Sequence, residues 1–166
     1  MEDRNYRETR CICPMCGQDV PWKGFIAREK VEGAWSVANV PMIKSIAMAE
    51  KETMIMVGLD TRHYIKCIVP VSIGTMDASL VHPRECFVHA ILVKAAAVIF
   101  VHNHPSGQLI PSQDDINITD KLVKSGEILG ISVLDSLIVS SRGVSSIIYD
   151  NSRALSWEKE EIPGEV

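Results

Sequence analysis

The chain has 166 residues, of which 46% are hydrophobic and 23% are charged, as in an ordinary globular protein and unlike a disordered one. Seventeen basic and 21 acidic residues give a formal net charge of −4, which does not favour non-specific binding to nucleic acid. No apolar run approaches the roughly 20 residues that span a bilayer, and the first residues lack an apolar signal core, so we expect no membrane segment and a cytoplasmic location.

The pattern along the chain changes near residue 40. Residues 1–40 are rich in glycine, proline and charged side chains and show poor periodicity, whereas residues 41–150 alternate apolar runs with regular turn signals. We therefore predict an N-terminal extension over residues 1–40, a single domain over 41–150 and a C-terminal tail over 151–166. The length is sufficient for one hydrophobic core and a short extension.

The five cysteines fall into two groups. Cys67 and Cys86 stand alone in apolar surroundings and are predicted to be buried thiols in a reducing compartment. In the extension, Cys11, Cys13 and Cys16 lie within six residues, and the last two have the Cys-x-x-Cys-Gly form of a zinc knuckle. A zinc ribbon needs a second cysteine pair, which is absent. Two alternatives stay open: the three thiolates share a metal with a ligand from elsewhere or from a second chain of a homo-oligomer, or they bind no metal.

Within residues 41–150, strands and helices are predicted to be mixed along the chain. The second of the two predicted helices runs from Gln113 to Leu129 and ends at Gly130, and the first begins at Pro83. Short apolar runs bounded by turn residues predict strands over residues 54–59, 64–69, 95–101, 131–139 and 144–148. Strands mixed with two helices predict an α/β fold, with a β-sheet covered on its faces by helices.

The buried run over residues 95–101 continues into His102-Asn103-His104, and Asp115 follows after a loop. In an extended segment His102 and His104 point to the same side, because side chains alternate with period two, and Asn103 points away from that side. Two imidazoles and a carboxylate are the type of ligand set found in catalytic zinc sites, which keep a fourth position for water. The alternative is a pair of polar loop histidines and an Asp115 that belongs to a capping box with Ser112.

The joint spacing is more specific than any of its parts. His-x-His-Pro, six residues, Ser, two residues and Asp, from His102 to Asp115, resembles the metal-binding signature of the JAMM/MPN metalloproteases. The string His102-Asn-His-Pro-Ser-Gly107, with Val81-His-Pro-Arg-Glu85 upstream, is similar to the RadC-like branch of that family, over about residues 43–150. The resemblance implies the JAB/MPN fold, a cytidine-deaminase-like sandwich in which helices flank a mixed β-sheet.

The resemblance also implies a cofactor and the roles of five residues. Zn²⁺ would be held by His102, His104 and Asp115. The family places a glutamate general base near the start of the first strand of the domain, and Glu52 stands there, immediately before an apolar run; Glu50 is the alternative. The serine of the motif, Ser112, would help to stabilise the tetrahedral oxyanion, in competition with helix capping.

We therefore predict a zinc-dependent hydrolase that cleaves a peptide or isopeptide bond in a peptide or protein substrate. Glu52 would take the proton of a zinc-bound water, whose pKa zinc lowers to about 7. The alternative is a non-catalytic accessory or binding module associated with DNA repair or mobile DNA, which the acidic composition does not support. The family pattern has a histidine after Asp135 where this chain has Ser136, so full activity is in question.

Overall fold

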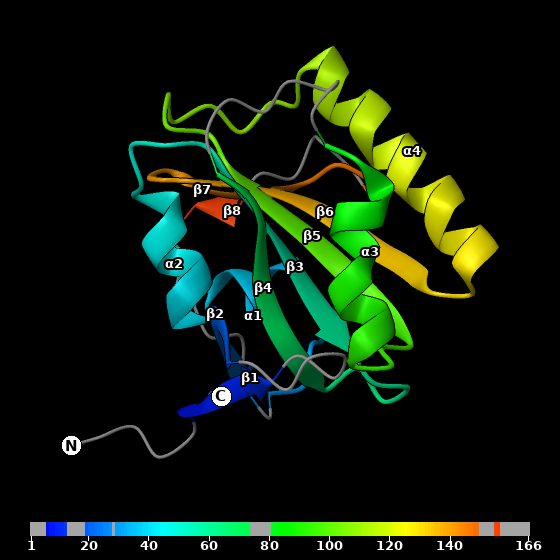
Figure 1. Cartoon of the computed structure of the whole chain (residues 1–166). Helices are drawn as coiled ribbons and strands as arrows, with labels where there is room; N and C mark the ends of the chain where they lie inside the picture. The colour runs from blue at the N-terminus through cyan, green and yellow to red at the C-terminus, as the bar shows by residue number, and fades with distance from the viewer. Residues whose placement is uncertain (1–5, 13–18, 28, 74–80, 150–154, 157–166) are drawn as a thin grey trace, which may run out of the picture.

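The computed structural model describes residues 6–12, 19–27, 29–73, 81–149 and 155–156 (Figure 1). The helices in these ranges are α1 (Ala34–Ala38), α2 (Pro41–Ala47), α3 (Pro83–Leu92) and α4 (Gln113–Leu129). The strands are β1 (Tyr6–Ile12), β2 (Asp19–Ala27), β3 (Thr53–Leu59), β4 (Ile65–Ile73), β5 (Ala97–Asn103), β6 (Ser132–Ser140), β7 (Gly143–Ser146) and β8 (Leu155–Ser156). The five strands and two helices predicted after residue 41 are all present, with ends that differ by a few residues.

Six of the strands form one mixed sheet in the order β4-β3-β5-β6-β7-β8. β3 is antiparallel to both β4 and β5, whereas β5 and β6 are parallel. Two parallel neighbours cannot be joined by a tight turn, and α4 supplies the crossover between them. α3 and α4 cover one face of the sheet and α1 and α2 cover the other (Figure 1). The predicted α/β fold, a mixed sheet flanked by helices, is confirmed.

The core divides into two layers because each central strand is buried on both faces. All seven residues of β3 and of β5 are buried, as expected for strands with helices on either side. Alternate residues belong to opposite layers: Ile55 and Val57 pack with α1 and α2, whereas Met54 and Met56 pack with α3 and α4. This alternation determines which face of the sheet each side chain at the end of β5 occupies.

The core also takes residues from the segment that we predicted to be an extension. Val31, Val37, Ala38 and Val40 are buried against the face that α1 and α2 cover. Farther upstream, β1 and β2 form an antiparallel hairpin, and β2 lies against β4. Buried packing thus begins on the N-terminal side of the expected boundary at residue 40. α1 has five residues, too few for a helix that is stable alone, so it depends on packing against the sheet.

The cysteine predictions divide between described and undescribed residues. Cys67 and Cys86 are buried, as predicted, and burial raises the pKa of the Cys86 thiol to about 12. Cys13 and Cys16 lie outside the described residues, and Cys11 belongs to β1, where only the backbone is described. The zinc knuckle stays a prediction.

The buried residues upstream of Val40 give a test of the domain boundary. A chain that starts at Val40 lacks Val31, Val37 and Ala38, and we expect its free energy of unfolding to fall by about 3 kcal/mol or more relative to a chain that starts at Glu29. Urea denaturation monitored by circular dichroism measures the difference. Equal midpoints of urea denaturation for the two chains would show that the residues before Val40 add no stability, as a domain boundary at residue 40 predicts.

Candidate metal centre

The two histidines of the motif stand where β5 leaves the sheet. His102 is the penultimate residue of β5 and is buried, with 1% of its surface exposed, and His104 follows the strand and is half-buried. As period two requires, both point to the same side, and their Nε2 atoms are 3.1 Å apart. Neither is a solvated loop histidine, so the first part of the alternative reading is excluded.

Asp115 completes the group from the first turn of α4. Its Oδ1 atom lies 3.2 Å from His102 Nε2, and its Oδ2 atom lies 3.4 Å from His104 Nε2. The capping box is present as well: the backbone N–H of Asp115 donates to Ser112 Oγ at 3.1 Å, and Asp115 Oδ2 accepts from the backbone N–H of Ser112 at 2.7 Å. The capping reading of Asp115 is therefore confirmed, and it is compatible with the metal-ligand reading, which stays a prediction.

The spacing of these atoms fits a cation of the size of zinc. For a tetrahedral zinc with nitrogen and oxygen ligands at roughly 2.0–2.1 Å, neighbouring ligand atoms are about 3.3 Å apart. The two imidazole Nε2 atoms are 3.1 Å apart, and each lies 3.2 or 3.4 Å from a different oxygen of the Asp115 carboxylate, which is near this spacing. The donor set is also chemically suitable, because imidazole and carboxylate are ordinary zinc ligands.

A second carboxylate, Glu52, shares the site. One ligand atom each from Glu52, His102 and His104 lie within 4.8 Å of one another, so these three residues form a cluster that can hold a metal ion. Glu52 ends the connection between α2 and β3 and is partly buried, whereas Glu50 is exposed. The structure thus brings Glu52 to the histidines, which favours it over Glu50. Asp115 and Glu52 are thus two carboxylates beside the same pair of imidazoles.

Hydrogen bonds orient His104 but leave one atom of His102 without a partner. His104 Nδ1 lies 3.1 Å from the carbonyl oxygen of Gln108, an outer contact of the kind that fixes a metal-binding imidazole with Nε2 toward the ion. His102 Nδ1 is buried and has no hydrogen-bond partner among the described residues. Such an orphaned donor costs about 1–3 kcal/mol, so the site is not optimised for stability.

The charges at the site are strongly coupled. Burial raises the pKa of Asp115, but hydrogen bonds from His102, His104 and Ser112 outweigh it and hold this pKa well below its usual range. The hydrogen bond to Asp115 raises the pKa of His104, and this effect exceeds that of burial, which lowers it. A carboxylate that stays ionised is ready to bind a cation over the whole physiological range of pH.

The loop between His104 and Ser112 is tied to the turn between β6 and β7. The Ser140 hydroxyl donates to the carbonyl of Gly107 at 3.3 Å, and the Ser145 hydroxyl donates to the carbonyl of Leu109. Gly107 has φ +79°, a backbone conformation that residues other than glycine rarely adopt, so this turn of the loop favours glycine. Sequence reasoning missed these serines, because nothing in their spacing relates them to the loop.

Ser112 and Ser136 both make hydrogen bonds within the fold. The Ser112 hydroxyl donates to Asp115 Oδ2 at 2.7 Å, so its proton is engaged in a third hydrogen bond beside the two of the capping box. Its role at an oxyanion stays a prediction and requires the hydroxyl to turn away from Asp115. Ser136, at the position of the family histidine, is buried on β6 and accepts a hydrogen bond at 3.0 Å from Thr119, one turn of α4 beyond Asp115.

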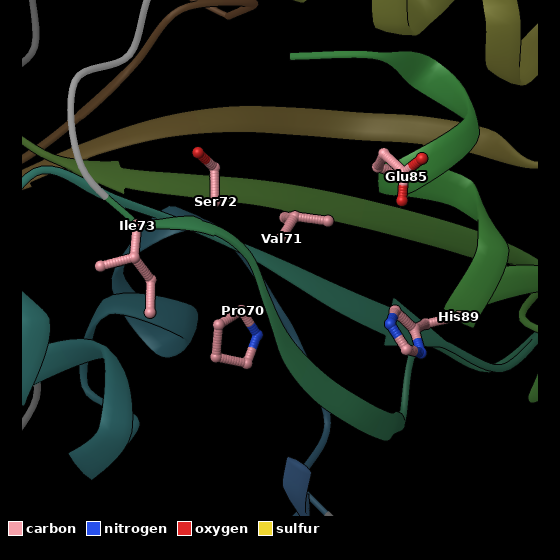
Figure 2. Close-up of a pocket in the computed structure, with 6 residues that line it drawn as sticks. All are labelled: Pro70, Val71, Ser72, Ile73, Glu85 and His89. Carbon is pink, nitrogen blue, oxygen red and sulfur yellow. The ribbon is translucent and has the colours of Figure 1, made fainter. Parts of the chain in front are cut away.

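A hollow of about 310 Å³ lies on the same face of the sheet, between β4 and α3 (Figure 2). Its walls are Pro70, Val71, Ser72 and Ile73 on one side and Glu85 and His89 on the other. Ser72 pairs with Met54, and Met54 pairs with His102, so two strand spacings, about 10 Å, separate this hollow from the metal centre. It is a neighbouring surface and not part of the ligand cluster.

Comparisons with known proteins agree with the motif. The profile of the RadC-like JAB domain family matches residues 34–153. A UPF0758 protein of Alkaliphilus oremlandii is 44% identical over 110 residues, which cover 66% of this chain and 47% of the relative. A UPF0758 protein of Methanosarcina acetivorans is 51% identical over 90 residues, 54% of this chain and 39% of the relative. The chain spans about half the length, or less, of these curated relatives.

No helix in the described parts of the chain is long and apolar enough to cross a membrane.

The ligand set predicts how zinc binding depends on one imidazole. We expect His104→Ala to weaken zinc binding at this centre by more than about 10²-fold, because even loss of an outer-sphere contact costs 10–100-fold. Competition with a chromophoric chelator measures the affinity. His89→Ala removes a histidine from the neighbouring hollow and serves as the control, which should bind zinc like the unmodified protein. Equal affinities in the two variants would show that His104 is not a ligand.

Proposed function

The chain belongs to the RadC-like JAB domain family, and we propose that it is a zinc-dependent hydrolase that cleaves a peptide or isopeptide bond. The observation that carries the proposal is the meeting of two imidazoles and two carboxylates, Glu52 and Asp115, at the end of one buried strand. A catalytic zinc site keeps one position for water, and we propose that His102, His104 and Asp115 bind the metal while Glu52 acts on that water.

His102, His104 and Asp115 are the residues that would hold the metal. Bound there, zinc would supply a water made acidic at neutral pH and a Lewis acid that polarises the substrate carbonyl. The short hydrogen bonds from Ser112 keep the Asp115 carboxylate turned toward the histidines. The buried position of His102 and Asp115 strengthens electrostatic interactions with a cation, because little water is present to screen them.

Glu52 is the proposed general base. Its carboxylate would accept a proton from the attacking water and then deliver that proton to the nitrogen of the leaving group. A base must lie within reach of the proton that it moves, directly or through one water, and the proximity of Glu52 to both histidines supports the assignment. Ser112 would add a hydroxyl donor near the developing oxyanion if it turns from Asp115, as the family resemblance implies.

The substrate is proposed to be a peptide or protein segment in extended form. β4 lies at one end of the described sheet, with β2 against it, and its last residues border the hollow beside α3 (Figure 2). The backbone of a strand at the end of a sheet can pair with an extended chain, and we propose that the residues of β4 beside the hollow do so. The buried thiol of Cys86, which forms no disulfide, supports a reducing compartment, and we propose the cytoplasm as the place of action.

One observation favours the alternative, a non-catalytic binding module. Ser136 stands where the family pattern has a histidine, and it makes its hydrogen bond to Thr119 rather than to the metal ligands. Such a module would bind zinc without hydrolysing any peptide. Activity, and not zinc content, distinguishes the two functions.

The proposed base predicts a separation of binding from activity. Glu52→Gln should keep zinc bound through the other ligands and lower the rate of hydrolysis by roughly 10²–10⁴-fold, the usual contribution of a general base. The zinc-loaded protein is incubated with a library of proteome-derived peptides, and mass spectrometry identifies the peptide that is cleaved for use in rate measurements.

Glu50→Gln is the matched control, since Glu50 is exposed and only two residues away. We expect it to retain full activity. A loss confined to Glu50→Gln would move the base to that residue. No cleavage of any peptide by zinc-loaded protein would favour the binding module.

A further inference from the structure

Asn103, between the two metal-binding histidines, points to the opposite face of the sheet and is fully buried. Its side chain makes three hydrogen bonds to the segment that precedes β3. Oδ1 accepts from the backbone N–H of Thr53 at 2.7 Å, and Nδ2 donates to the carbonyls of Ala49 and Lys51, each at 3.2 Å. The sequence predicted that this side chain turns away from the histidines, and these hydrogen bonds confirm it.

These contacts require an amide. The segment presents one donor and two acceptors to a buried side chain, and asparagine matches them with one acceptor and two donors. The match also determines the orientation of the amide, because a flipped side chain would set oxygen against two carbonyls. An alanine would leave three backbone groups without this partner in a buried place.

Two of the three partners belong to the residues on either side of Glu52. The carbonyl of Lys51 and the N–H of Thr53 are the backbone groups that immediately precede and follow Glu52 in the chain. The ladder between β3 and β5 begins at Met54, which pairs with His102. Asn103 therefore extends the attachment of this segment to β5 beyond the ladder, up to the residues that carry the acid.

We propose that Asn103 is a positioning residue that sets Glu52 relative to His102 and His104. The last two residues of β5 and the residue after it then bring the proposed base and two proposed metal ligands together. His102 and His104 face the metal centre, and Asn103 between them holds the backbone on either side of Glu52. The inference rests on the proposed function of Glu52 as the base. A displacement of about 1 Å in a catalytic group can cost about 10²-fold in rate, so a backbone clamp of this kind matters to activity.

The position of the segment can be tested without a substrate. Asn103→Ala should speed hydrogen exchange at the Thr53 amide, because the acceptor of that amide is removed. Asn103→Ser is the smaller change, for use if Asn103→Ala does not fold, and it should have the same effect, because it moves the acceptor. Zinc affinity should stay within about 2-fold of the unmodified protein, since the ligands face away from the change. Asn117→Ala, at an exposed position on α4, is the matched control and should leave exchange at Thr53 unaltered. Unchanged exchange at Thr53 in both Asn103 variants would overturn the proposal.

A double-mutant cycle on the cleaved peptide tests the link to Glu52. In the unmodified background, we expect Asn103→Ala to lower kcat by about 10²-fold with KM little changed. In the Glu52→Gln background it should lower kcat by less than about 2-fold, because a misplaced glutamine loses nothing further. Equal loss in both backgrounds would overturn the proposal, since Asn103 would then act on the fold in general. If Glu52→Gln leaves kcat unchanged, Glu52 is not the base, and the positioning role of Asn103 is overturned with it. If Glu52→Gln lowers kcat but Asn103→Ala leaves it unchanged, only the positioning role of Asn103 is overturned.

Discussion

The alternation of side chains along β5 is the constraint on which the candidate centre depends. A strand buried on both faces must place successive residues in opposite layers, and here the last residues of such a strand are His102 and Asn103, followed by His104. A shift of one residue in register would turn the imidazoles toward the layer that α1 and α2 cover and the amide toward Asp115. The hydrogen bonds of Asn103 oppose that shift, because the donor and the two acceptors that match its amide lie on the face that it occupies.

The parallel pairing of β5 with β6 brings the third ligand into place. Parallel strands need a crossover, and α4 both makes this connection and begins beside the end of β5. The capping box at Ser112 then fixes Asp115 in the first turn, where its carboxylate also faces the histidines. Helix capping and ligand placement thus use the same two residues, so the local stability of α4 and the geometry of the metal centre are coupled.

The sequence was sufficient for the fold class and for five strands and two helices, because each has a local signal, but it did not predict α2. It also pointed to His102, His104 and Asp115, which the structure brings together. The periodicity of residues 95–101 identifies β5, and the spacing from His102 to Asp115 identifies the motif. What it could not supply depends on contacts between distant segments. The packing of Val37 and Ala38 under the sheet has no local signature, because α1 is short. Glu52 is likewise favoured over Glu50 by its position in space, because it lies beside the two histidines and Glu50 is exposed. In the sequence, both residues stand on the same short connection before the strand, and no local signal separates them.

X-ray absorption at the zinc edge tests the central claim most directly. The full chain with Cys11, Cys13 and Cys16 changed to serine removes the competing thiolates of the N-terminal segment. We expect one zinc with nitrogen and oxygen ligands at about 2.0–2.1 Å, including two imidazoles, and no sulfur at about 2.3 Å. A protein that binds no zinc after these changes, or that shows sulfur from Cys67 or Cys86, would contradict a centre built from His102, His104 and Asp115.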